Sequence, residues 1–525
     1  MRLFDRIKIE NRGEKGERSL SHKQLSHKHQ APNSLRILPD EVPLRGGEGP
    51  LGGPLRWPPT PEQEVPRTLR TLARIVDGGL CHRCGSCVGI CPTGVLACDT
   101  EEYPRIKDLS ACTDCQLCVK VCPGDSFEAD HVSRQLFGVP SNHHDTHGHF
   151  VDQCVAHATD PRVREGSTSG GLVTALLLDL LERGEIDGAV TIQSDTVELW
   201  RGRPMIARSP EELLSAMKSK YAIAPTNILL EEIRERPGRY AVVGLPCQIH
   251  GIRKAAELDE RIRSRVVLTI GLFCHAAIEH EAYGVLWGML GDTAKGARRF
   301  ISRIGKHPGT PYLELDDGTL YPLYFGDRTK GYRPTSIEMI NILYRLYTPE
   351  RCLTCYDATA EFADIAVGDP WMAPPEEGVN FYDGWSFALI RSPYAQSICK
   401  RMADEGTLKL VGVTRREALA CNSLMAGEKR WRAFRVIETR RRQGKPIPEY
   451  GFETPRHSPG HFLKTELHMW SHLFCFLPRF RAGVLRFILS PVGYWLLWLN
   501  NQRRQFRFWR RDTLAYLRRR WWGRR

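Results

Sequence analysis

The sequence lacks the long apolar runs by which secreted and membrane-spanning chains are recognised. Its first residues, beginning at Met1, are polar and basic and contain no hydrophobic stretch of the kind that a signal peptide requires. The segment 472–499 is rich in Leu, Phe and Trp, but arginines and Pro491 interrupt it before it reaches the roughly 18 uncharged residues of a spanning helix. We therefore expect a cytoplasmic protein, in whose reducing surroundings clustered cysteines bind metal more often than they form disulfides.

Acidic residues are scarce near the C-terminus, and this scarcity explains most of the net charge. Residues 501–525 contain ten arginines and one acid, Asp512, and so supply +9 of the formal charge of +13. Because the excess belongs to an appendage, it does not indicate a nucleic-acid partner. Tryptophans are interleaved with the arginines, at Trp495, Trp498, Trp509, Trp521 and Trp522. We expect residues 426–525 to form a basic, aromatic tail that lies on the cytoplasmic face of an anionic membrane. The alternatives are a re-entrant or spanning hairpin, and a partner-binding or poorly ordered tail.

The chain is too long for one core, so two folded regions with appendages are expected. In residues 31–66, 14 of 36 positions are Pro or Gly, which predicts that residues 1–66 are a disordered extension. A short helix over Thr68–Val76 then opens a cysteine-rich segment, 67–135. From 150 to 425, strands alternate with helices, which predicts an α/β (α+β) domain with a mixed sheet. Its clearest strands are Gly188–Ile192, Tyr240–Val243 and Val266–Leu272.

Cysteine is abundant, and eight of the 17 cysteines form two copies of one motif, Cys-x2-Cys-x2-Cys-x3-Cys-Pro. The copies are Cys81, Cys84, Cys87 and Cys91 before Pro92, and Cys112, Cys115, Cys118 and Cys122 before Pro123. This is the spacing of bacterial two-cluster ferredoxins, in which the fourth cysteine of each copy binds the other [4Fe–4S] cluster. We therefore predict one cluster on Cys81, Cys84, Cys87 and Cys122, and another on Cys112, Cys115, Cys118 and Cys91. Zinc is the alternative, but zinc knuckles need neither the third and fourth cysteines nor the prolines.

Four further cysteines are spread over the second domain, at Cys247, Cys274, Cys352 and Cys355. Two of them follow predicted strands, and residues beyond the C-terminal ends of parallel strands gather at one edge of a sheet. The spacing alone is equally compatible with a third metal site and with free buried cysteines. We interpret the other five as small buried side chains, namely Cys98, Cys154, Cys399, Cys421 and Cys475. The histidine-rich segment 143–149 is interpreted as a solvated loop, with a metal site as the alternative.

Several short segments of the second domain stand in an order that is specific as a set. They are Ser169–Ala175, Ser219–Tyr221, Gly244–Gln248, Gly251–Lys254, Cys274, Cys352–Cys355 and Ala363–Asp369. In these segments the domain resembles the beta subunits of coenzyme F420 hydrogenases and dehydrogenases, a family of proteins that contain flavin and iron–sulfur clusters. The resemblance implies a third [4Fe–4S] cluster on Cys247, Cys274, Cys352 and Cys355.

The same resemblance implies FAD. The candidate contacts are Ser169, Gly170, Gly171, Thr174, Lys220, Tyr221 and Gln248. Support from the residues themselves comes from the predicted helix that begins after Gly170 and Gly171, because backbone amides at a helix N-terminus suit a pyrophosphate.

These cofactors together indicate an oxidoreductase. Clusters carry single electrons, whereas hydride donors exchange electrons in pairs, and a flavin converts between the two. We expect electrons to pass between a hydride-type organic substrate, such as reduced coenzyme F420, and a redox partner protein or ferredoxin. No catalytic acid or base is selected, although Asp369, His275 and Gln248 are candidates. Two alternatives stay open: a ferredoxin-dependent reductase of an organic substrate, and a non-catalytic electron-transfer subunit of a larger complex.

Overall fold

The structure is a computed structural model that describes residues 65–307, 309–323, 336–455, 459–500 and 502–503. The predicted disordered extension, apart from its last two residues, lies outside the described residues. So does the arginine-rich end of the tail from residue 504 onward.

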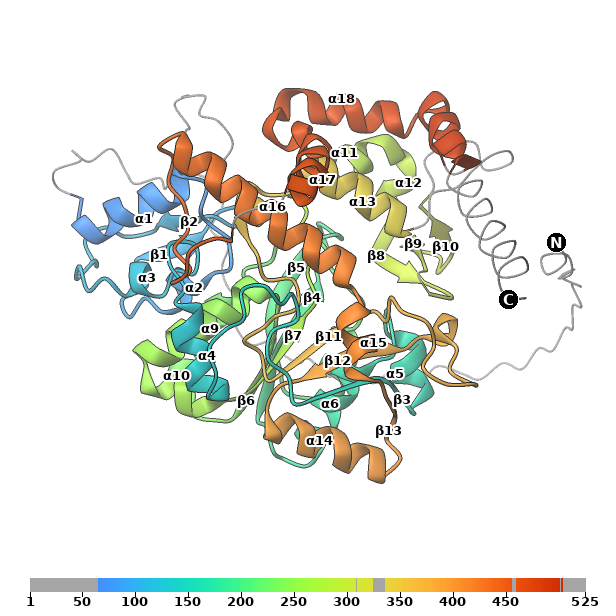
Figure 1. Ribbon diagram of the computed structural model, residues 1–525, viewed down its shortest axis with the longest axis horizontal. Helices are drawn as coiled ribbons and strands as arrows, with labels where there is room; N and C mark the ends of the chain where they lie inside the picture. The colour runs from blue at the N-terminus through green and yellow to red at the C-terminus, as the bar shows by residue number, and fades with distance from the viewer. Residues whose placement is uncertain (1–64, 308, 324–335, 456–458, 501, 504–525) are drawn as a thin grey trace, which may run out of the picture. The chain divides into compact units, whose positions relative to one another are not determined.

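The cysteine-rich segment folds into short helices around a small antiparallel sheet (Figure 1). Its elements are α1 (Arg67–Asp77), α2 (Ser86–Gly89), β1 (Leu96–Cys98), β2 (Pro104–Ile106), α3 (Leu117–Lys120) and α4 (Ala129–Phe137). α2 and α3 each begin after a residue in the left-handed conformation, Gly85 and Gln116, and each carries the third cysteine of its motif. The two copies of the motif therefore share one local structure, and the predicted helix Thr68–Val76 is confirmed as α1.

An eight-stranded mixed sheet forms the centre of the larger domain, in the order β13-β3-β12-β11-β7-β6-β4-β5. Its strands are β3 (Asp152–Ala158), β4 (Gly188–Ser194), β5 (Gly202–Ala207), β6 (Tyr240–Gly244), β7 (Val266–Leu272), β11 (Ile365–Gly368), β12 (Ser386–Ile390) and β13 (Leu408–Gly412). The neighbours β4, β6, β7 and β11 are parallel, and the other pairs are antiparallel. The predicted mixed sheet and its three clearest strands are thus confirmed.

Both faces of this sheet are covered, as the alternation along β6 shows. Ala241 belongs to a buried cluster with α6 (Leu172–Glu182) and α14 (Pro393–Asp404). The next residue, Val242, belongs to a second cluster with α9 (Pro246–Leu258), α16 (Ser423–Arg442) and the cysteine-rich segment. Side chains that alternate between two cores are typical of a strand buried on both sides. Shorter helices complete the domain: α5 (Pro161–Gly166), α7 (Pro210–Ser215), η2 (Thr226–Leu229), α8 (Leu230–Glu235), α10 (Glu260–Arg265), η3 (Glu350–Thr354), η4 (Phe381–Asp383) and α15 (Arg415–Ala420).

A third buried cluster joins the tail to a smaller antiparallel sheet and its helices. The sheet consists of β8 (Ala297–Ile304), β9 (Thr310–Leu315) and β10 (Leu320–Pro322), beside α11 (His280–Leu290), α12 (Asp292–Lys295) and α13 (Ser336–Tyr347). The tail contributes α17 (Pro459–Trp470), η5 (Leu473–Phe476), α18 (Pro478–Ile488) and a helix over Pro491–Asn500. Among the described helices none passes by itself the length and hydropathy test for a membrane span; α18 and the helix after it pass together, bent by 78°.

The cysteine-rich segment is joined to the larger domain by hydrogen bonds to its cluster-motif backbone. Asn227 N donates to the Cys84 carbonyl at 3.0 Å, Arg234 Nη1 to the Ile90 carbonyl at 2.8 Å, and Lys254 Nζ to the Cys122 carbonyl at 3.1 Å. Because these bonds accompany a shared apolar core, the segment is held in one position against α9 and η2.

Two interpretations of the sequence are wrong. His147, which the sequence interpretation placed in a solvated loop, is only 1 % exposed. Its Nε2 lies 2.8 Å from the Cys421 carbonyl, so this buried side chain links two segments that are far apart in the chain. Cys98, placed among buried side chains without a role, is only half-buried and lines a cavity together with cluster-motif cysteines. The other four single cysteines are buried as expected: Cys154, Cys399, Cys421 and Cys475.

Substituting Gly251 tests the close packing of the cysteine-rich segment against α9. A Cβ at this position would overlap with the Ser86 hydroxyl and lie 2.8 Å from Asn227 Nδ2. We expect Gly251→Ala to lower the free energy of unfolding by about 1–3 kcal/mol. Gly284→Ala in α11 is the matched control, because nothing lies within 4 Å of its added Cβ and alanine favours a helix by up to about 1 kcal/mol. Chemical denaturation followed by circular dichroism measures both; equal stability of the two variants would contradict tight docking.

Candidate iron–sulfur centres and cofactor site

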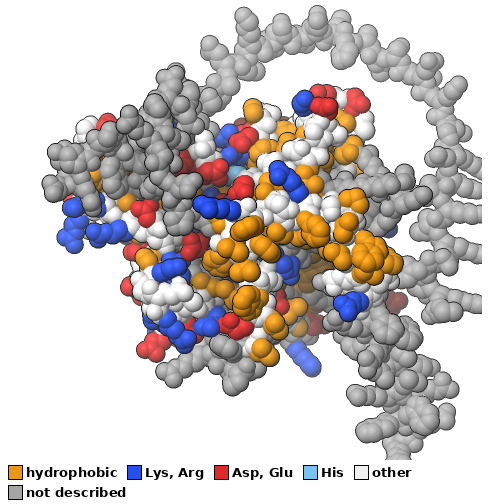
Figure 2. Space-filling model, turned by 90° about the horizontal axis from the view of Figure 1, so that it is seen from above, with side chains coloured by type: hydrophobic (Ala, Val, Ile, Leu, Met, Phe, Trp, Pro, Cys, Tyr) orange, Lys and Arg blue, Asp and Glu red, His pale blue; other side chains and the backbone are white. Residues whose placement is uncertain are grey.

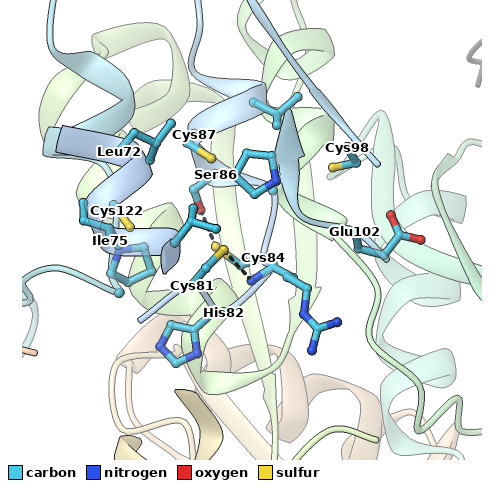
Figure 3. A pocket seen from close by; sticks show the side chains of 17 residues that line it. Leu72, Ile75, Cys81, His82, Cys84, Ser86, Cys87, Cys98, Glu102 and Cys122 are labelled. Carbon is cyan, nitrogen blue, oxygen red and sulfur yellow. Dashed lines mark hydrogen bonds between the residues drawn. The ribbon is translucent and has the colours of Figure 1, made fainter. Parts of the chain in front are cut away.

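Four cysteines from both motifs line one cavity in the cysteine-rich segment (Figure 3). They are Cys81, Cys84, Cys87 and Cys122, the set that the ferredoxin crossover predicts. Burial raises the pKa of the Cys81 thiol to about 12, and the Cys122 thiol contributes to the increase. Burial, followed by the Cys84 thiol, likewise raises the pKa of Cys122 to about 11. Thiols this reluctant to ionise become ligands when a positively charged group replaces their protons.

The complementary set lines a second cavity, beside α1 and α3. Its members are Cys91, Cys112, Cys115 and Cys118. Burial raises the pKa of Cys118 to about 12, and the thiols of Cys91, Cys115 and Cys112 add to this effect. Cys115 is exposed, so this set is the one that lies nearest to solvent.

Both sets have the donor chemistry of a [4Fe–4S] cube, which is held by four thiolates. No group of three His, Cys, Asp or Glu side chains in the described ranges is close enough to hold one metal ion. A cube binds each thiolate at a separate iron corner, so its ligands surround a space and do not meet at a point. Four thiols around one cavity fit that requirement.

A third set of thiols gathers where β6 and β7 end. Cys247 lies in the first turn of α9, Cys274 follows β7, and Cys352 and Cys355 lie in and just after η3. Burial is the largest cause that raises the pKa of Cys247 well above its usual range; the Cys84 thiol follows, and then the three other thiols of the set. The fold therefore brings four thiols together at the sheet edge, in electrostatic proximity to Cys84 of the first set.

Buried cations accompany the third set. Lys429 of α16 is 2 % exposed, and its Nζ donates to the Cys274 carbonyl at 2.8 Å. Burial alone would lower the pKa of Lys429, but the thiols of Cys355 and Cys274 raise it overall. Arg432, fully buried one turn later, lies near Cys352 and donates to His275 Nε2 at 3.1 Å. These cations offset the negative charge of thiolates in a low-dielectric interior.

The first and third sets are also connected through Arg351. This side chain is 1 % exposed and lies next to Cys352 in η3. Its Nη2 donates to the Pro123 carbonyl at 3.1 Å, directly after Cys122, and its Nη1 donates to the Thr354 hydroxyl at 2.8 Å. The loop that carries Cys352 and Cys355 is thereby fixed to the end of the second motif.

The predicted flavin loop stands before α6. Gly171 has φ 78°, a left-handed conformation that glycine adopts without strain. A Cβ at Gly170 would overlap with the Ala156 carbonyl, while the Ser169 hydroxyl donates to the Trp385 carbonyl. Thr174 is half-buried in the first turn of α6. The two glycines thus allow the loop to cross β3 and β12 closely.

Four basic side chains gather near this loop. Lys218 Nζ donates to the Ser167 carbonyl at 2.8 Å, and Lys220 Nζ to the Ala216 carbonyl at 2.7 Å. Burial, followed by the neighbouring Arg299, lowers the pKa of Lys220 to about 7. Burial, followed by Arg299 and Arg303, lowers the pKa of Lys218 to about 8. Like charges crowded in this way are typical of a site that binds an anion.

Arg303 of β8 organises two predicted site residues. Its Nη1 lies 2.9 Å from Asp369 Oδ2, and its side chain is hydrogen-bonded to Tyr221. Its Nη2 lies 3.0 Å from His307 Nδ1, and the His307 ring is 5.1 Å from that of Trp371. Asp369 is therefore held in place by the Arg303 guanidinium, which favours a positioning role.

Gln248 and His275 are held by other groups. Gln248 accepts from Leu245 N at 2.7 Å and donates to the Ala224 carbonyl at 2.8 Å, so both ends of its side chain are used at the start of α9. His275 is bonded to Arg432 beside the third thiol set. Sequence reasoning missed Lys429, Arg299 and Arg303, because single basic residues carry no spacing signal and β8 lies far along the chain from the loop it approaches.

Three family models match the chain. The "4Fe-4S dicluster domain" matches residues 75–127. The N-terminal and C-terminal models of "Coenzyme F420 hydrogenase/dehydrogenase, beta subunit" match residues 154–231 and 238–416.

Curated relatives agree with these models. The chain is 27 % identical to the coenzyme F420 hydrogenase subunit beta of Methanothermobacter thermautotrophicus, over 57 % of this chain and 99 % of that protein. It is 26 % identical to a subunit of the F(420)H(2) dehydrogenase of Methanosarcina mazei, over 64 % of this chain and 85 % of that protein. It is 27 % identical to the coenzyme F420-dependent sulfite reductase of Methanocaldococcus jannaschii, over 62 % of this chain and 46 % of that protein.

Among solved structures, a chain of the F420-reducing [NiFe] hydrogenase complex from Methanosarcina barkeri matches 59 % of this chain and 98 % of its own length, with 22 % identity and a TM-score of 0.43. The resemblance in the sequence segments is confirmed by the family models. This chain is an iron–sulfur oxidoreductase that belongs to the family of coenzyme F420 hydrogenase/dehydrogenase beta subunits and carries a 4Fe–4S dicluster domain ahead of the beta-subunit region.

Proposed function

We propose that this chain passes electrons between a hydride-type organic substrate and one-electron carriers, using FAD and three [4Fe–4S] clusters. The observation that carries the proposal is the position of Cys247. Its thiol lies in electrostatic range both of Cys84 in the first set and of the three other thiols at the sheet edge. Three sets of four thiols that adjoin in this order form a route for single electrons from the larger domain to the dicluster segment.

The residues of the third set fit a cluster of their own. Four buried or half-buried thiols supply the donors, and Lys429 supplies a cation fixed by the Cys274 carbonyl. Hydrogen bonds and charges near the sulfurs set the potential of such a cluster. We infer that Lys429 raises the potential of this centre relative to one without a buried cation.

The residues near the α6 loop fit the phosphates of FAD. Lys218, Lys220 and Arg299 supply basic side chains, and a bound phosphate would stabilise the charged forms of the two lysines. Arg299 is half-buried and has no hydrogen-bond or ion-pair partner among the described residues. Bound FAD supplies the conversion between paired and single electrons. The chain's own residues hold the phosphates, orient Tyr221 through Arg303, and keep Asp369 paired with that arginine.

The names of the relatives support a proposal for the substrate and for the complex in which the chain works. Those in Methanothermobacter and Methanosarcina are named as subunits of an F420 hydrogenase and an F420H2 dehydrogenase, and the one in Methanocaldococcus as an F420-dependent reductase. We propose reduced coenzyme F420 as the hydride donor, and a larger complex in which a protein partner exchanges electrons with the dicluster segment.

The number of clusters can be measured directly. We expect about twelve irons per wild-type chain, from three cubes of four, and about eight in Cys274→Ser, because the third set then loses a ligand. Cys399→Ser, a buried cysteine on α14, is the control and should keep about twelve. Iron and sulfide are quantified on protein purified without oxygen. About eight irons in the wild type, or an unchanged iron content in Cys274→Ser, would contradict the proposed third cluster.

The cationic site near the α6 loop, formed by Lys218, Lys220, Arg299 and Arg303, leads to a prediction about flavin affinity. We expect Arg299→Ala to weaken FAD binding by roughly 10- to 100-fold, the effect of losing one charged hydrogen bond. Arg298→Ala, which alters the neighbouring residue of β8 whose guanidinium pairs with Glu314, should bind FAD as the wild type does. Quenching of FAD fluorescence on titration with flavin-free protein measures both. Equal FAD affinities of the two variants would mean that the phosphates of FAD bind at another site.

The donor is identified by mixing the oxidised holoprotein with one reductant at a time. Reduced coenzyme F420 should bleach the flavin absorbance and then the cluster absorbance, whereas NADH and NADPH should not. If only reduced ferredoxin bleaches the protein, the chain is a ferredoxin-dependent reductase. A preparation that contains clusters and no flavin is a relay subunit.

A further inference from the structure

The tail helices expose a broad apolar surface, which we call the tail face. On α17, Leu463, Leu467 and Trp470 are each 65–68 % exposed. The surface continues along η5, α18 and the following helix through Phe476, Phe480, Phe487, Val492, Trp495 and Trp498, which are 40–60 % exposed. Figure 2 looks onto the side where α17 and α18 lie in Figure 1 and shows hydrophobic side chains gathered there with Lys and Arg between them. Contiguous apolar surface of this kind marks an interaction site.

The inner side of the same helices is fastened to the body of the protein. Leu485, Leu489 and Tyr494 are 0–9 % exposed and share a buried cluster with α11 and α13. Arg481 forms an ion pair with Glu281 of α11, and its guanidinium lies 4.9 Å from the centre of the Tyr347 ring. α18 therefore lies flat against the protein with its other side turned outward, the orientation of an interfacial helix.

The charge of the tail face is almost entirely positive. From Pro459 to Asn500 the sequence contains a single acid, Glu466, and the structure pairs this side chain with Arg435. Arg479 and Arg486 lie among the apolar side chains of α18. The chain then continues into residues 501–525, with ten arginines and one acid. Apolar and aromatic residues bordered by arginine match an anionic bilayer, which offers an acyl boundary beneath negative headgroups.

We propose that the tail face docks the protein peripherally on an anionic lipid bilayer, at the cytoplasmic face of the membrane, with α17, α18 and the helix Pro491–Asn500 lying in the headgroup region. The docking surface lies beyond residue 416, where the matched models of the beta subunit end, so it is an addition of this chain to the region that they cover. The proposal is independent of which substrate the redox site uses.

Contacts behind η5 connect the tail helices to the third thiol set. Cys475 of η5 is buried, and its thiol donates to the Arg345 carbonyl at 3.3 Å. Behind it, Arg432 approaches His472 with an Nη1–Nε2 distance of 3.3 Å and lies near Cys352 of the third thiol set. Arg432 therefore links the tail helices to the third thiol set.

Vesicle flotation of the full chain tests the proposal. Phosphatidylcholine vesicles with and without phosphatidylglycerol are compared for the wild type and for the triple variant Trp470→Ser, Phe480→Ser, Trp495→Ser. The double variant Val197→Ser, Leu424→Ser is the matched control, because these side chains are 84 % and 63 % exposed on other elements. We expect the wild type and the control to float with the anionic vesicles, and the triple variant to bind at least about tenfold more weakly.

Each other outcome contradicts the proposal. Equal binding of the triple variant would mean that the tail face is not the lipid contact. No flotation of the wild type at low salt would exclude a bilayer as the occupant. Self-association in sedimentation velocity that the triple variant abolishes, without any lipid binding, would assign the surface to a second copy of this chain. Iron content and circular dichroism, measured on every variant, ensure that weaker binding is not due to unfolding.

Discussion

The electrostatic proximity of Cys247 to Cys84 is the feature on which the proposed redox architecture depends. Cys247 occupies the first turn of α9, at the end of a central strand, and Cys84 belongs to the first motif of the dicluster segment. For these thiols to be neighbours, the segment has to pack closely against α9 and η2. Gly251 and the hydrogen bonds of Asn227, Arg234 and Lys254 provide that fit. A looser attachment would leave three separate groups of cysteines and no route between them.

Because most thiols of the three sets are shielded from solvent, they need nearby positive charge in order to ionise. In the protein alone, loss of solvent raises the pKa of the thiols of Cys81, Cys118, Cys122 and Cys274, which favours their neutral forms. Cluster binding would replace each proton by iron and leave net negative charge in the interior. Lys429, Arg351 and Arg432 are buried at the third set, where water has little access to solvate that charge. The cations are thus part of the site as much as the cysteines are.

Local sequence patterns allowed much of the fold and of the candidate site to be predicted. The cysteine spacing is confined to short loops, so the two ferredoxin sets could be assigned from sequence, and the apolar strands Tyr240–Val243 and Val266–Leu272 indicated the sheet. The third thiol set and the cationic site were harder, because they depend on elements far apart in the chain. Nothing in the sequence around Arg299 or Lys429 distinguishes them from surface basic residues. His147 looked solvated for the same reason, since the Cys421 carbonyl that binds it lies 274 positions away.

The bond from Arg351 to the Pro123 carbonyl has a consequence for how the protein matures. It fastens the loop of the last two cysteines to the proline that closes the second motif, although 228 positions separate them. The dicluster segment is made first during synthesis, but its final placement waits for a loop that emerges much later. The cysteine-rich segment can therefore complete its packing only after η3 has been synthesised, so the final enclosure of its cysteines depends on the second half of the larger domain.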